Sequence, residues 1–303
     1  MNKKKWLLGG FSALLAAALL TGCGEDTSSE PETAAVETEE TETEIANENA
    51  EAGKYEDGIY FAQEDGFAES GWKYMVTLEV KDGKIVSADW NGANKAGGND
   101  KVTASVSGEY GMVEKGGAQA EWHEQADKAE AYLLETQDPT AIEYTDDEGH
   151  TDAISGVSIH VVEFFDLAEK ALANGPVEKG AYKDGAYYAE EDEFGDSGWK
   201  YTASLTVVNG YIVAADWNGI FKDGGDDKDT VSQNGEYGMV EKGGAQAEWH
   251  EQAEKAESYL LEIQDPTAIE YTDDEGHTDA ISGVSIHVVE FFDLAEKALA
   301  EAK

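Results

Sequence analysis

The sequence predicts an α+β fold: two tandem copies of a small antiparallel sheet with two packed helices, after a disordered acidic tether. The first observation is an internal repeat, because Trp72 recurs as Trp199 and Ser158 as Ser285, at one offset and without a gap. The second is the order within each copy, where strand-like alternation precedes helical apolar stripes. The third is composition, since 41% hydrophobic residues are enough to form a core in each copy.

Residues 1–22 have the layout of a lipoprotein signal peptide. Three lysines near the start precede an apolar run that is too short to cross a bilayer comfortably. The run ends in LTGC at residues 20–23, which resembles a bacterial lipobox and implies cleavage before Cys23 and lipidation of its sulfur. We therefore expect an exported protein, lipid-anchored to the outer face of the cytoplasmic membrane. A plain signal peptide or an uncleaved anchor is the alternative.

Residues 23–53 are predicted to be an acidic disordered linker that begins at the lipidated cysteine. They contain almost no large apolar side chain that could offset the entropy lost on ordering. The whole chain has 65 acidic and 21 basic residues and a formal net charge of -44. Because such a surface repels phosphate backbones, we expect no nucleic-acid partner.

The two repeats are assigned to residues 54–175 and 181–303. Residues 108–173 match residues 235–300 almost without change, whereas the first halves of the repeats have diverged. The features shared by those first halves include Asp57-Gly58 with Asp184-Gly185, SGWKY at 70–74 and 197–201, and ADWNG at 88–92 and 215–219. The near-identity of the second halves indicates a recent duplication.

Each repeat begins with strand signals. Residues 58–62, 74–80 and 85–90 read as strands, and Asp82-Gly83 between the last two is typical of a two-residue hairpin turn. Asn209-Gly210 supplies the same turn in the second repeat.

Helical signals follow the strands. Residues 118–135 carry one apolar stripe that includes Trp122 and Leu133, and Pro139 ends this helix. Residues 140–145 are predicted to form a short strand. A second amphipathic helix is predicted over residues 159–173.

The loop DAISGVS precedes this second helix and occurs at residues 152–158 and 279–285. A glycine and two hydroxyls beside a helix N-terminus suit a phosphate group, because backbone N–H groups are unpaired there. Ordinary capping of the helix by Ser155 or Ser158 is the alternative.

The loop resembles the motif Asp-x-x-(Ser/Thr)-Gly-Ala-(Thr/Ser) of the FMN-binding domain family, with Val157 in place of Ala and Ser158 in place of the commoner Thr. DGIY at 57–60, VKDGKI at 80–85 and the terminal helix follow in family order. The chain is also similar to the lipid-anchored, two-domain electron-transfer flavoproteins of this family. The resemblance implies two FMN groups, held by phosphoesters that an ApbE-type flavin transferase installs. It implies covalent acceptors at Ser158 and Ser285, and cofactor-binding residues Asp152, Ser155, Gly156, Asp279, Ser282 and Gly283.

A flavin ring also needs a flat apolar surface, and Trp90 and Trp217 are the candidates for stacking because each ends a strand before Asn-Gly. No metal site is expected. His123-Glu124 lacks the second histidine of a zinc protease, and the acidic stretch 146–152 lacks the spacing of an EF-hand.

The resemblance implies an electron-transfer flavoprotein rather than a substrate-turnover enzyme. Electrons would come from a membrane quinone-linked donor and leave to an extracellular acceptor such as ferric iron or free flavin. A non-redox cell-surface binding lipoprotein with duplicated ligand-binding domains is the alternative function. A hydrolase that uses Ser158 is disfavoured, because His160 stands where a nucleophile elbow requires glycine.

Overall fold

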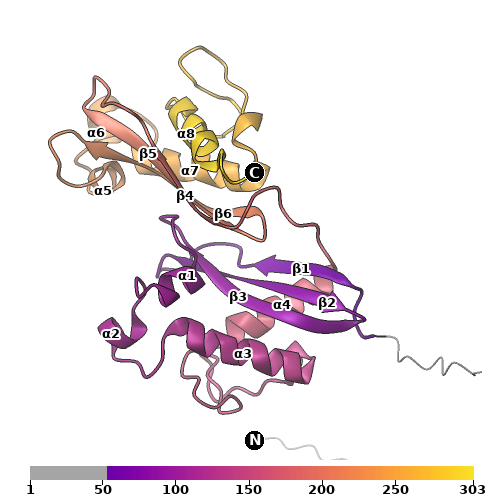
Figure 1. Ribbon diagram of the computed structural model, residues 1–303. Coiled ribbons are helices and arrows are strands. Elements are labelled where there is room, and N and C mark those ends of the chain that lie inside the picture. Colours follow the sequence, from indigo (N-terminus) through magenta and orange to yellow (C-terminus); the bar gives the residue numbers. More distant parts are fainter. Residues whose placement is uncertain (1–52) are drawn as a thin grey trace, which may run out of the picture. The chain divides into compact units, whose positions relative to one another are not determined.

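The computed structural model describes residues 53–303 (Figure 1). The expected signal peptide (1–22), the lipidated Cys23 and the linker up to residue 52 lie outside the described residues. Within residues 53–303, no helix combines the length and the apolar composition that crossing a bilayer requires.

Three antiparallel strands form the sheet of the first repeat, in the order β1 (Gly58–Gln63), β2 (Trp72–Lys81) and β3 (Lys84–Asn94). The three predicted strands are confirmed, with slightly longer bounds for each. The predicted turn is confirmed as well, because Asp82 and Gly83 have φ values of 52° and 70°. Two positive φ values in succession are typical of the type I′ turn that Asp-Gly favours.

Two long helices cover one face of this sheet. Helix α3 (Trp122–Thr136) packs against β3, and α4 (Val162–Asn174) packs against β1 and β2 (Figure 1). Helices α1 (Lys101–Val106) and α2 (Met112–Gly116) precede α3 and were not predicted. The predicted strand at 140–145 is wrong: a 3-10 turn, η1 (Pro139–Ala141), begins there, and residues 142–145 belong to no strand. The proline and the Asp138 side chain, which caps the turn, favour this tight turn over a strand.

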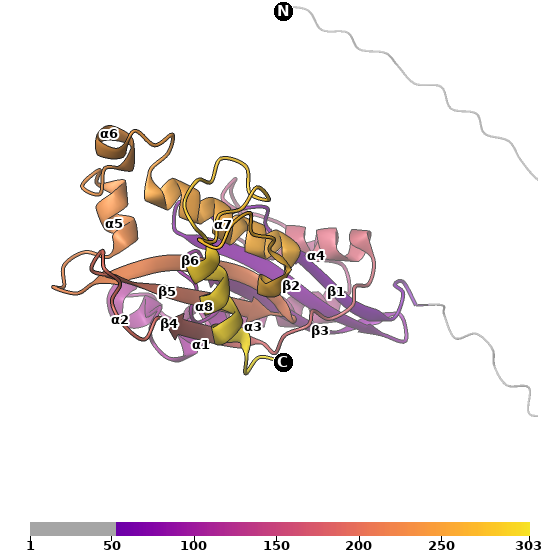
Figure 2. The same cartoon turned by 90° about the horizontal axis from the view of Figure 1, so that it is seen from above.

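The second repeat has the same order of elements. Its members are β4 (Gly185–Glu190), β5 (Trp199–Val208), β6 (Tyr211–Phe221), α5 (Lys228–Gln233), α6 (Met239–Gly243), α7 (Trp249–Ile263), η2 (Pro266–Ala268) and α8 (Val289–Leu299). Helix α7 packs against β6, and α8 crosses β4 and β5 (Figure 2). Two three-stranded antiparallel sheets, each packed with helices, confirm the predicted α+β class.

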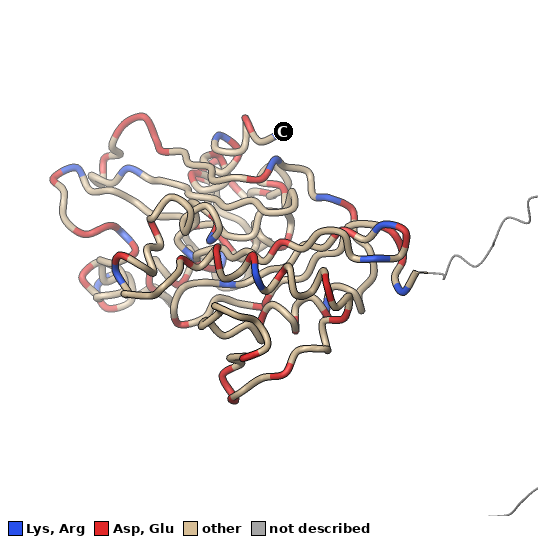
Figure 3. Tube along the Cα trace, turned by 60° about the horizontal axis from the view of Figure 1, so that its bottom comes forward, with Lys and Arg blue, Asp and Glu red and all other residues tan. Residues whose placement is uncertain are grey.

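The core of the first repeat lies between its sheet and helices α3 and α4. The predicted α3 stripe is confirmed, since Trp122, Ala126, Ala129 and Leu133 are all buried. Phe164 and Phe165 fill the space from α4. The equivalent residues of α7 and α8 build the second core in the same way. Acidic side chains greatly outnumber basic ones along both repeats (Figure 3).

The first sheet also receives residues from beyond its terminal helix. Val177 forms an isolated antiparallel bridge with Ile59, and its N–H donates to the Ile59 carbonyl at 2.7 Å. A Cβ on Gly58 would lie 2.7 Å from the Pro176 ring, so glycine is required there. Pairing with the first sheet therefore continues past residue 175, where the sequence analysis ended the first repeat.

Candidate functional site

Ser158 is exposed, and its loop is held in place by a buried glutamine of α3. The Ser158 backbone N–H donates to Gln125 Oε1 at 2.8 Å, and the Ser158 hydroxyl donates to the same oxygen at 3.2 Å. Gln125 is 1% exposed, and its own amide donates to the Ala120 carbonyl. In the second repeat, Ser285 makes both bonds to Gln252, at 2.7 and 3.1 Å.

The turn before this serine requires its glycine. Gly156 has a φ of 76°, and a Cβ there would lie 2.8 Å from Lys128 Nζ. Lys128 donates to the Gly156 carbonyl at 2.9 Å and so brings a cation to the loop. Gly283 and Lys255 repeat this arrangement. The predicted residues Asp152 and Ser155, like Asp279 and Ser282, are exposed on the same loops.

The relation of this loop to the following helix differs from the prediction. Helix α4 begins at Val162 rather than residue 159, and its N-cap is Val161, which makes no side-chain capping bond. Capping by Ser155 or Ser158 is therefore wrong, because the loop is bonded to Gln125 instead. Ser158 stands before the helix, and the N–H of Val161 is already bonded to the Gly149 carbonyl. The Val161 amide is therefore not available to a phosphate.

The two tryptophans predicted to stack on a flavin lie in the core. Trp90 is 0% exposed and Trp217 is 1% exposed. Trp90 packs against Trp122 and Phe164, with ring centres 5.1 and 5.4 Å away. A ligand ring could reach neither face without opening the core, so the structure does not fit a stacking role for Trp90 or Trp217. The backbone N–H groups of these two tryptophans donate to the carboxylates of Glu130 and Glu257.

A different aromatic cluster surrounds a buried cation. Lys101, the first residue of α1, is 1% exposed and lies among rings from β2, from α3 and from the loop after α1. We call these rings the aromatic cage. The distances from Lys101 Nζ to the ring centres are 4.1 Å for Tyr110, 4.3 Å for Trp72, 5.0 Å for Tyr74 and 5.4 Å for Trp122. Ring faces attract a cation at such distances.

The backbone around Lys101 is built to admit its side chain. Asp100 caps α1 by accepting the Thr103 N–H, and Asn91 Oδ1 accepts the Val102 N–H. Gly92 leaves room for the lysine stem, because a Cβ on this glycine would lie 3.2 Å from Lys101 Cδ.

The second repeat contains the same cage around Lys228. The distances from Lys228 Nζ to the ring centres are 4.6 Å for Tyr201, 4.6 Å for Tyr237, 5.0 Å for Trp249 and 5.3 Å for Trp199. Here the ammonium also donates to the hydroxyls of Tyr201 and Tyr237, at 2.9 and 3.1 Å.

Burial shifts the ionisation of both lysines. It lowers the pKa of Lys101 to about 7 and the pKa of Lys228 to about 8, because desolvation disfavours the ammonium. The negative charge of Glu163 opposes this shift at Lys101. His160 Nδ1 lies 2.7 Å from Glu163 Oε2, and this hydrogen bond raises the pKa of His160.

The serine loop and the aromatic cage meet at the first turn of α3. Trp122, a wall of the cage, and Gln125, which holds Ser158, are three positions apart and both buried. Residues at this spacing lie on the same side of a helix. His160, close to Ser158 in the chain, also lies within the electrostatic reach of Lys101. Each repeat therefore places an exposed hydroxyl beside an aromatic cluster that contains a cation.

Sequence reasoning did not find Lys101 or Gln125. The sequence contains a signal for Lys101, because Asp100-Lys101 recurs as Asp227-Lys228 in a stretch where about half of the positions have changed between the repeats. No feature of the sequence singles out Gln125, because nearly every residue in its half of the repeat is the same in both copies.

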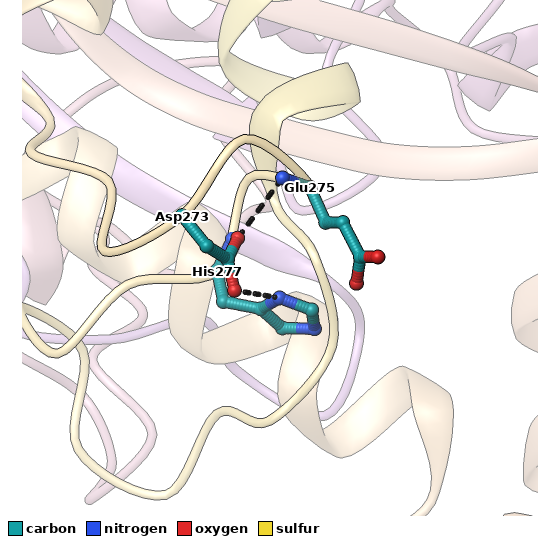
Figure 4. A group of neighbouring side chains, drawn as sticks. All are labelled: Asp273, Glu275 and His277. Carbon is teal, nitrogen blue, oxygen red and sulfur yellow. Dashed lines mark hydrogen bonds and ion pairs between the residues drawn. The ribbon is translucent and has the colours of Figure 1, made fainter.

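One cluster of metal-ligating groups occurs among residues 53–303, and it consists of Asp273, Glu275 and His277 (Figure 4). Hydrogen bonds within the loop account for this arrangement. Asp273 Oδ1 accepts the N–H groups of Glu275 and His277, and Oδ2 is bonded to His277 Nδ1 at 2.8 Å. These bonds, led by the His277 backbone N–H, hold the pKa of Asp273 below its usual range. The cluster is thus a self-bonded polar turn.

No family model and no curated protein matches the chain. Two solved structures are similar to part of it. A protein from Clostridium thermocellum, solved by solution NMR, is 66% identical over 39% of this chain and 91% of its own, with a TM-score of 0.33. The crystal structure of CPE2226 protein from Clostridium perfringens is 26% identical over 40% of this chain and 89% of its own, with a TM-score of 0.32. TM-scores below 0.5 do not establish a shared overall fold.

Proposed function

We propose that the protein is an exported, lipid-anchored electron carrier with one FMN in each repeat, joined by a phosphoester to Ser158 and to Ser285. The observation that carries the proposal is the duplicated pairing of an exposed serine hydroxyl with a neighbouring aromatic cluster. The motif resemblance supplies the identity of the cofactor. A membrane quinone-linked donor and an extracellular acceptor, such as ferric iron or free flavin, complete the electron path.

The residues present fit such a group. Ser158 is exposed and therefore accessible to a flavin transferase, and Lys128 places a positive charge at the loop where a phosphate would be held. Trp72, Tyr74 and Tyr110 are only partly buried, so they replace Trp90 as candidates for contact with a ring. Trp199 is less available in the second repeat, at 8% exposed.

The chain's own residues have defined tasks in this proposal. Gln125 accepts the Ser158 backbone N–H and so holds the backbone at the attachment residue, while the hydroxyl gives up its own bond to Gln125 when its proton is replaced by the phosphate. Lys128 offsets phosphate charge in a chain with a large acidic excess. FMN, when bound, supplies the exchange of electrons, while the protein orients it and tunes its potential.

The test is intact mass spectrometry of the full chain produced with and without an ApbE-type flavin transferase. We expect a gain of two FMN units only with the transferase. Ser158→Ala and Ser285→Ala should each lose one unit, and the double variant should lose both. Thr140→Ala and Thr267→Ala are the matched controls, because each removes an exposed hydroxyl outside the serine loop and should keep both units.

A mature protein that stays unmodified and colourless contradicts the proposal. It would favour the non-redox binding lipoprotein. A bound but non-covalent flavin would retain electron transfer and reject the phosphoester.

A further inference from the structure

When protonated, the caged lysines carry a charge that no carboxylate in the described chain neutralises directly. Ion pairs within residues 53–303 involve other lysines, such as Lys170 with Asp65 and Lys200 with Glu190, but neither Lys101 nor Lys228. A buried charge is costly unless it is paired. In a chain with 65 acidic residues, a buried lysine without an acidic partner in contact therefore needs a separate explanation.

Stability alone does not explain the ammonium. Apolar side chains of similar volume often replace buried charges with a gain in stability. A methionine, which is also unbranched and flexible, would pack against the same rings without the desolvation cost.

Divergence between the repeats points to the same lysine. The motifs SGWKY and ADWNG survive in the first halves, and both contribute to the cage. Trp72 and Tyr74 of SGWKY are two of its walls. Asn91 and Gly92 of ADWNG position α1 and admit the lysine stem. Two walls of the cage and the lysine itself are thus among the residues that both first halves keep, together with core and turn residues.

We propose that Lys101 and Lys228 stabilise the reduced, negatively charged form of the flavin ring attached to Ser158 and Ser285, and thereby raise its reduction potential. This inference rests on the proposed function. The oxidised ring takes up two electrons from a quinol-class donor and one proton from the medium, which leaves one negative charge on the ring. The donor becomes a quinone and releases its two protons.

Local charge outweighs net charge in this arrangement. The acidic surface alone predicts a lowered potential. Exposed charges farther away than about 10 Å are largely screened at 0.1 M salt, whereas a buried cation is screened much less. Lys101 Nζ lies 5.4 Å from the centre of the Trp122 ring, and Trp122 is one helical turn from Gln125, which anchors the serine loop. Its charge therefore acts on this site at shorter range than the dispersed surface charges.

The experiment uses the full chain with Ser285→Ala, loaded with one flavin in the first repeat. Potentiometric titration below neutral pH compares Lys101→Met with Lys228→Met on this background. We expect Lys101→Met to lower the ratio of reduced to oxidised flavin at fixed potential by at least about tenfold, which is about 30 mV for a two-electron couple. Lys228→Met is the matched control and should leave the potential unchanged, because its repeat carries no flavin.

On the Ser158→Ala background the flavin is in the second repeat. There, Lys228→Met should lower the potential and Lys101→Met should leave it unchanged. A variant-free measurement covers the case in which a methionine variant does not fold. The neutral, fully reduced ring loses one proton to become the anion. The pH at which this happens should be lower in the loaded protein than in free FMN titrated beside it.

The outcomes separate the two proposals. If no flavin is attached, the proposed function fails. If flavin is attached but Lys101→Met and Lys228→Met have equal potentials, or if the reduced ring in the protein titrates like free FMN, this inference is overturned while the proposed function stands.

Discussion

At the scale of single residues, Gly92 determines how closely the backbone of β3 approaches Lys101. The added Cβ of an alanine would meet Lys101 Cδ at 3.2 Å, Lys101 Cβ at 3.3 Å and the Lys73 carbonyl oxygen at 3.3 Å. All three atoms are buried with little freedom to move, so the strand and α1 would have to separate slightly.

We expect Gly92→Ala to lower the free energy of unfolding by about 1–3 kcal/mol, the usual cost of overpacking a core. Urea denaturation measures this change. Gly116→Ala is the control, because nothing lies within 4 Å of its added Cβ and the site is helical. It should be neutral or stabilising by about 0.5–1 kcal/mol. Equal stability of Gly92→Ala and the parent would show that the cage is looser than described.

The residues of the candidate site could be predicted only in part. Ser158 and Gly156 were identified because a family motif marks them, and the structure places both on an exposed loop. Trp90 was chosen for its place at a strand end, but burial depends on which face the helices cover, and a local pattern does not contain that information. Gln125 contacts Ser158 across a long chain separation, so local spacing could not reveal it.

At the scale of elements, Glu121 connects α2 to α3. Its carboxylate accepts the N–H groups of Met112 and Val113 at 2.8 and 3.1 Å. These N–H groups lie at the start of α2 and have no acceptor within the helix itself. Its own backbone N–H donates to Glu124 in the first turn of α3. A helix of five residues cannot persist alone, so α2 depends on this carboxylate.

Glu121→Ala should therefore lower the free energy of unfolding by about 1–2 kcal/mol, as the loss of a helix cap does. Hydrogen exchange at the Met112 and Val113 amides should become faster, because both lose their acceptor. Glu135→Ala, at an exposed position late in α3, should change stability by less than about 0.5 kcal/mol. Unchanged exchange at Met112 in Glu121→Ala would be inconsistent with this role.

Strands were easier to predict than short helices in this chain. Alternating side chains and an Asp-Gly turn specify β2 and β3 locally, and α3 is long enough to show a full apolar stripe. Helices α1 and α2 have six and five residues, too few for a repeating stripe. The start of α4 was misplaced because Ile159 is apolar and partly buried like a helix residue, although the chain turns there.

At the scale of the whole molecule, the net charge of -44 is the dominant electrostatic feature. Folding brings the carboxylates of residues 53–303 closer together than they are in the unfolded chain, so mutual repulsion destabilises the folded repeats. Added salt screens this repulsion.

We expect the melting temperature to rise steadily as sodium chloride increases from low concentration to about 0.5 M, and calorimetry measures it. Tetramethylammonium chloride at equal ionic strength is the control for screening. Equal curves support general screening by either salt. A rise with sodium alone, or no rise with either salt, would reject repulsion as the cause.

The two cages differ in their hydrogen bonds, because tyrosine hydroxyls accept from the ammonium of Lys228 but not from that of Lys101. If each lysine raises the reduction potential of its neighbouring flavin, the ammonium of Lys228, which the two hydroxyls stabilise, should raise it more than the ammonium of Lys101 does. The flavin of the second repeat would then have the higher reduction potential and would be reduced first. A duplication that began with two identical domains would thus have produced two flavin sites of different reduction potential.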